Sequence, residues 1–149
     1  MQQNATINKI VQYEAALLDT NLTSSDFARY VEKISTLREQ LFYSLADKAK
    51  KNKNLKNLLI EDAVRFVQVE EVLLTRDLSQ KQFSSFLQYI NETYENLQEF
   101  DEDNTLLNSI TQRLTNIIKS LRLQKSDKIS DVYSLLYQIR EQASAKTQN

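Results

Sequence analysis

Residues Phe66–Leu97 read FVQVEEVLLTRDLSQKQFSSFLQYINETYENL, and Ile10–Leu41 read IVQYEAALLDTNLTSSDFARYVEKISTLREQL. At an offset of 56 residues, ten of the 32 aligned positions are identical, and the identities extend from one end of the segment to the other. Apolar residues recur in both copies at helical spacing on either side of a polar stretch. We interpret the two segments as copies of one helical hairpin.

The turn within each copy carries the chemistry of a helix start. Thr23 and Ser79 stand where an N-cap hydroxyl accepts a backbone amide of the next turn, and Asp26 and Gln82 stand three residues later, as in a capping box. A leucine precedes each cap and a phenylalanine follows at N4, which is the spacing of a hydrophobic staple. These staple pairs are Leu22 with Phe27 and Leu78 with Phe83. The same local signal therefore predicts the start of the second helix in both copies.

The composition favours an all-α fold. The 149 residues suit a single domain, 1–149, and they include no glycine and no proline. Tight turns with positive φ and phosphate-binding loops usually require glycine, so helices joined by polar Asn, Ser and Asp connections are the natural solution. We expect an antiparallel helical bundle of about six helices, in which the two copies supply four.

The rest of the chain completes the bundle with a C-terminal helical hairpin. The segment Gln98–Asn104, QEFDEDN, reads as a loop, after which Asp103 or Asn104 is expected to cap a fifth helix and Ser126 a sixth. Lysines at positions 48–56 mark the end of the second helix, where Asn52 and Asn54 can supply either the left-handed residue in place of glycine or the cap of the third helix. Whether the second and third helices are continuous stays open. The termini, 1–5 and 143–149, have little apolar content and are expected to fray.

The residue types that are missing exclude the commonest catalytic sites. Without histidine the chain lacks the usual general base and the commonest transition-metal ligand, and without cysteine it has neither disulfides nor thiolate chemistry. We therefore expect no enzyme activity, no cofactor and no metal. No apolar run is long enough to cross a bilayer, so we expect no membrane insertion of this chain.

Charge is distributed unevenly along the sequence. Residues 1–56 carry a net charge of +3, residues 57–112 of −8 and residues 113–149 of +4, which together give −1. The pattern fits either complementarity within the fold or a bipolar surface for a charged partner. The lysines at 48–56 have no interleaved aromatic residues and the pI is about 5.6, so we expect no nucleic-acid binding.

Glu14 and Glu70 are the candidate residues for chemistry, because they occupy matching positions on the apolar stripes of the two copies. One interpretation is a buried carboxylate pair that neutralises a cationic ligand or metal inside the bundle. The other places each glutamate at the edge of its stripe, with its carboxylate in water or bonded to an arginine such as Arg29 or Arg65. The sequence favours the edge.

Tyr43, Tyr89 and Tyr137 fall off the strongest apolar faces and are candidates for a binding interface, where tyrosine is common. Our leading hypothesis is a non-catalytic helical protein-interaction module, such as an adaptor, an inhibitor or a chaperone-like regulator, with an unidentified protein partner. The alternative is an extracytoplasmic helical-bundle sensor or ligand-binding domain of a signalling receptor. A homodimer stays open in both cases.

Overall fold

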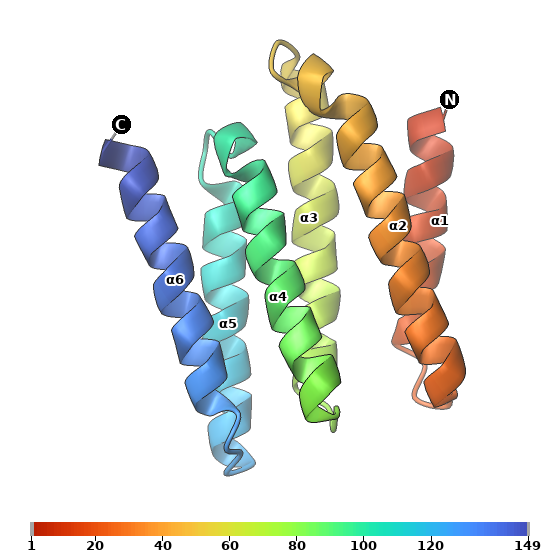
Figure 1. The fold of residues 1–149 in the computed structure, drawn as a ribbon, viewed down its shortest axis with the longest axis vertical. Helices are drawn as coiled ribbons and strands as arrows, with labels where there is room; N and C mark the ends of the chain where they lie inside the picture. Colours follow the sequence, from red (N-terminus) through yellow and green to blue (C-terminus); the bar gives the residue numbers. More distant parts are fainter. Residues whose placement is uncertain (1, 149) are drawn as a thin grey trace. The chain divides into compact units, whose positions relative to one another are not determined.

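A computed structural model describes residues 2–148, which form six α-helices and one short 3-10 helix (Figure 1). No strand occurs among these residues, and the helices pack against one another, so the predicted all-α bundle is confirmed. The helices are α1 (Gln2–Leu17), α2 (Ser24–Ala49), α3 (Lys53–Leu74), α4 (Gln80–Leu97), η1 (Gln98–Phe100), α5 (Thr105–Leu123) and α6 (Ile129–Gln148).

The chain divides into two compact units, Met1–Asp62 and Ala63–Asn149, with the boundary inside α3. They are the N-terminal unit and the C-terminal unit. The single domain 1–149 therefore stays a prediction. Helix α1 begins at Gln2 and α6 extends to Gln148, so most of the segments 1–5 and 143–149 is helical, while Met1 and Asn149 lie outside the described residues. Fraying of these ends is untested.

Both copies of the repeat form the predicted hairpin, the first as α1–α2 and the second as α3–α4. Thr23 accepts the Asp26 amide at 3.1 Å, and Ser79 accepts the Gln82 amide at 3.2 Å. In the second copy Gln82 completes the capping box by accepting the Ser79 amide. In the first copy the Asp26 carboxylate instead forms an ion pair with Arg29 at 3.0 Å.

Helices α2 and α3 are separate, and a side chain marks the break. Residues 50–52 leave the helix, and Asn52 Oδ1 accepts the backbone amides of Asn54 at 3.0 Å and Leu55 at 3.3 Å. Within the N-terminal unit, Arg38 of α2 forms an ion pair of 2.9 Å with the buried Asp62 of α3. Asn52 therefore caps α3, and α2 and α3 do not form one continuous helix.

The start of α5 differs from the prediction. Asn104 occupies the N-cap position with φ of 57°, but its side chain makes no capping bond. The buried Asp101 supplies the acceptors instead, because its two carboxylate oxygens accept the amides of Leu106 and Leu107, each at 2.9 Å. At the next turn Ser126 accepts the Lys128 amide at 3.1 Å, one residue before α6.

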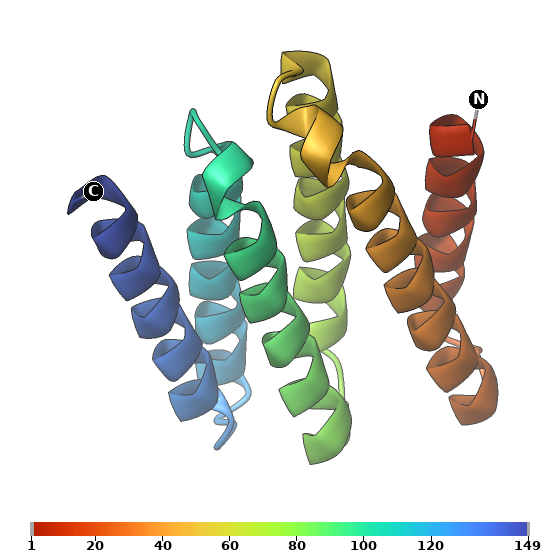
Figure 2. The same ribbon diagram turned by 45° about the horizontal axis from the view of Figure 1, so that its top comes forward.

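The core of the C-terminal unit is formed mainly by α4, α5 and α6. Figures 1 and 2 show α4 and α6 side by side in one layer, with α5 behind them. Their fully buried side chains include Phe83, Ile90, Tyr94, Leu106, Ile110, Leu114, Ile117, Val132 and Ile139. In the N-terminal unit α1 and α2 pack antiparallel through the buried residues Ile10, Leu17, Ile34 and Leu41.

The staple phenylalanines provide a stability test, because Phe83 is fully buried while Phe27 is half-buried. Phe83→Ala should lower the free energy of unfolding by about 3 to 5 kcal/mol, measured by chemical denaturation. Phe27→Ala, at the matching position of the first copy, should cost less than about 2 kcal/mol because less area returns to water. A cost below about 1 kcal/mol for Phe83→Ala would contradict the assigned turn.

Candidate functional site

Glu14 and Glu70 are both buried, with 2% and 0% of their surfaces exposed. The placement of their carboxylates in water is therefore wrong, and a bond to an arginine such as Arg29 or Arg65 stays a prediction. The buried face of α1 runs through Ile10, Glu14 and Leu17, at i, i+4 and i+7, so the glutamate stands at its centre.

The second copy repeats this register, because Phe66, Glu70 and Leu73 are all buried on α3. Glu14 belongs to the N-terminal unit and Glu70 to the C-terminal unit, so their pairing stays a prediction. In the part of the chain that the structure describes, no three acidic side chains gather into a group that could hold a metal ion.

The three candidate interface tyrosines have different environments. Tyr43 on α2 is 74% exposed and Tyr137 on α6 is 65% exposed. Tyr89 on α4 is half-buried and packs edge-on against Phe86, with ring centroids 6.0 Å apart. A hydrogen bond to Glu141 raises the pKa of Tyr137. Tyr43 and Tyr137 are thus available to a partner on separate units, whereas Tyr89 contributes partly to packing.

A groove between α1 and α2 is the feature that sequence reasoning missed. It has a volume of about 460 Å³ and is lined by Lys9 and Tyr13 of α1 and by Arg29, Glu32, Lys33, Thr36 and Leu37 of α2. Beside it the rings of Tyr13 and Tyr30 lie 5.4 Å apart, and the Arg29 guanidinium lies 5.1 Å from the Tyr30 ring centroid. The groove therefore combines aromatic and aliphatic surface with cationic side chains.

The positive charge of the groove comes mainly from its two lysines. Arg29 is already paired with Asp26, whereas within residues 4–146 neither Lys9 nor Lys33 forms an ion pair. Both lysine side chains are exposed, one on each helix. Glu32 is the acidic residue of the lining. An anionic group in this groove would thus meet lysine from both sides.

The repeat shows what is unusual about the α1–α2 surface. Tyr13, Tyr30 and Leu37 are half-buried, and their counterparts 56 residues later are all buried; these are Val69, Phe86 and Thr93. Likewise Val11 is 40% exposed, whereas the identical residue of the second copy, Val67, is 0% exposed. Positions that are covered in the second copy are thus open in the first.

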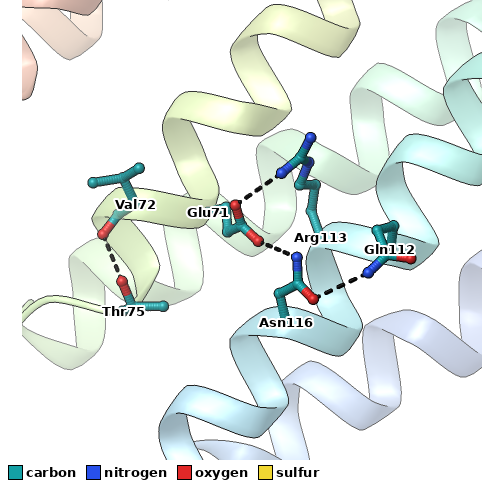
Figure 3. Close-up of polar contacts among 6 residues, drawn as sticks. All are labelled: Glu71, Val72, Thr75, Gln112, Arg113 and Asn116. Atoms are coloured by element: carbon teal, nitrogen blue, oxygen red, sulfur yellow. Dashed lines mark hydrogen bonds and ion pairs between the residues drawn. The ribbon is translucent and has the colours of Figure 1, made fainter.

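A second polar cluster lies between α3 and α5 in the C-terminal unit (Figure 3). The Glu71 carboxylate accepts hydrogen bonds from Arg113 Nη1 at 3.1 Å and from Asn116 Nδ2 at 2.6 Å. Gln112 Nε2 in turn donates to the Asn116 side-chain oxygen at 3.1 Å. Each member has a partner on the neighbouring helix or turn, so we assign this cluster a structural role in holding α3 to α5.

Tyr94 of α4 lies in the core near the cap of α5. It is fully buried, and its hydroxyl has no hydrogen-bond partner among the described residues. Burial, and secondarily the negative charge of Asp101, raises the pKa of Tyr94. Lys146 Nζ donates to the Asp101 carbonyl oxygen at 3.1 Å, which ties α6 to the same loop.

Comparison with protein-family models, curated proteins and solved structures finds no match for this chain. Within residues 2–148, no helix combines the length and the apolar character needed to cross a bilayer.

Tyr94→Phe should leave the free energy of unfolding at pH 7 unchanged or raise it by up to about 1 kcal/mol, because the buried hydroxyl lacks a partner. Since the folded-state pKa of Tyr94 lies above 10.0, the unfolded chain ionises first, and the parent loses stability as the pH rises through that value. Between pH 9 and pH 11 the free energy of unfolding, measured by urea denaturation, should fall less for the variant than for the parent. A loss above about 1 kcal/mol at pH 7 would indicate a hydrogen bond to this hydroxyl.

Proposed function

We propose that this chain is a non-catalytic helical protein-interaction module that docks a protein partner on the face of its α1–α2 hairpin that carries the groove. Docking a segment of one protein in a groove between helices is a common mode of recognition. An adaptor, an inhibitor or a chaperone-like regulator would each use such a surface.

The observation that carries the proposal is the difference in burial between the two copies of the repeat. Tyr13, Tyr30 and Leu37 keep the positions of a packing surface, and their counterparts in the second copy are buried. A partner that covers the apolar area left open in the first copy removes it from water. This burial would stabilise the complex by about 25 cal/mol per Å².

The docking surface extends beyond the groove along α2. Arg29, Thr36 and Tyr43 are separated by seven residues each, so they lie on the same face of the helix. Tyr43 is strongly exposed, and exposed tyrosines provide much contact area at a low cost in side-chain entropy. The surface would therefore run from the groove to Tyr43.

A second candidate function is the ligand-binding sensor domain. The groove volume of about 460 Å³ lies in the range of small-molecule sites, and its lysines suit an anionic ligand. The strong exposure of Tyr43 outside the groove favours a larger partner. A thermal-shift screen of small carboxylates and phosphates separates the two, because a marked rise in Tm with a small ligand supports only the sensor.

Two matched double variants test the proposal by affinity capture of the full chain from a lysate of its source, quantified by mass spectrometry. Lys33→Glu with Tyr43→Ala alters the proposed surface, and Lys119→Glu with Leu123→Ala makes matched changes on exposed residues of the C-terminal unit. All four side chains are exposed, so both variants should fold like the parent.

The control should capture the same proteins as the parent in similar amounts. The α1–α2 variant should capture about tenfold less of them, because contacts at the centre of an interface carry most of its binding energy. Equal capture by all three chains would place the binding surface elsewhere. Turnover of a substrate that Glu14→Gln or Glu70→Gln abolishes would overturn the non-catalytic assignment.

A further inference from the structure

We infer that the segment that docks on α1–α2 is an acidic amphipathic α-helix of the protein partner, with carboxylates on both sides of its apolar stripe. The inference depends on the proposed function and specifies the chemistry of the partner at that surface.

The walls of the groove place a positive charge on each side. Lys9 lies on α1 and Lys33 on α2, both exposed and both without an ion pair in the described part of the chain. A helix lying between them would bring its two flanks within reach of one lysine each. Asp or Glu at these flanks would be favoured, and Lys or Arg would be repelled.

The floor of the groove favours an apolar stripe between those flanks. Tyr13 and Leu37 line it and are half-buried, and the Tyr13 ring packs against Tyr30. A helix presents residues i, i+3, i+4 and i+7 on one side, which is the width of an apolar stripe that fits between two helices. The counterparts of these floor residues in the second copy are buried, as expected for positions suited to packing.

The length of the surface sets the length of the partner helix. From Arg29 to Leu37, α2 rises about 12 Å, and from Arg29 to Tyr43 about 21 Å, at 1.5 Å per residue. A helix of about 14 residues, or four turns, would therefore cover the groove and reach Tyr43. A single phosphate or carboxylate would meet only the lysines and would leave Tyr43 uncovered.

The test uses two designed helical peptides of about 16 residues that share one leucine stripe. In one peptide glutamates flank the stripe, and in the other lysines replace them. Binding to the full chain is measured by fluorescence anisotropy, and the contacted residues are located by NMR chemical-shift changes. We expect the acidic peptide to bind about tenfold more tightly, with shifts at Tyr13, Leu37 and Tyr43 and weaker binding at high salt.

A charge exchange makes the test specific. Lys9→Glu with Lys33→Glu should lower the affinity for the acidic peptide about tenfold and raise the affinity for the basic peptide, because both lysines lie at the flanks of the bound helix. Lys81→Glu with Lys119→Glu, two exposed lysines of the C-terminal unit, should leave both affinities unchanged. Thermal unfolding of each variant confirms that the fold is retained.

The outcomes separate this inference from the proposed function. If both peptides bind with equal affinity and shift the signals of Tyr13 and Leu37, the docking of a helix on α1–α2 stands, but the inference that the partner helix is acidic is wrong. If neither peptide shifts any residue of α1 or α2, both ideas are overturned. Concentration-dependent self-association that Lys9→Glu with Lys33→Glu abolishes would make a second copy of the chain the occupant instead.

Discussion

At four of the five turns between the α-helices of residues 2–148, a side-chain oxygen accepts backbone amides at the start of the next helix, and at the fifth turn a serine hydroxyl accepts the amide of Lys128, one residue before α6. The acceptors are Thr23, Asn52, Ser79, Asp101 and Ser126. The first amides of a helix have no partner within it, and a chain without glycine or proline must reverse direction with ordinary residues. Side-chain acceptors meet both requirements, and they set where each helix begins and therefore which face it buries.

With the helix starts set in the same way, the two copies of the repeat fold alike but have different surroundings. Val67 and Phe83 are buried in the second copy, whereas Val11 and Phe27 of the first are partly exposed. A packing surface that remains open is a natural place for a partner, because its side chains already suit helix contact. The lysines of the groove then add a preference for the charge of that partner.

The sequence predicted much of the fold, because caps and apolar spacing are local signals. Thr23, Asn52 and Ser79 accept amides of the helices that follow them, as expected, whereas Ser126 accepts the amide of Lys128, one residue before α6. Asp101 was missed because it acts from five residues before its amide, across a loop that places Asn104 in the left-handed region. Glu14 was assigned to the edge because burying a carboxylate is costly, whereas the buried face of α1 runs through Ile10, Glu14 and Leu17. The groove could not be predicted, because both copies carry the same pattern of apolar residues and caps, and that pattern does not say which copy the rest of the chain covers.

The most direct test of this account compares identical residues in the two copies by hydroxyl-radical footprinting. Phe27 with Phe83, and Leu18 with Leu74, have the same intrinsic reactivity within each pair, so any difference in oxidation rate reports exposure. The account predicts faster oxidation of Phe27 and Leu18, which are half-buried, than of the fully buried Phe83 and Leu74. Equal rates within both pairs, or faster oxidation of the second copy, would contradict it.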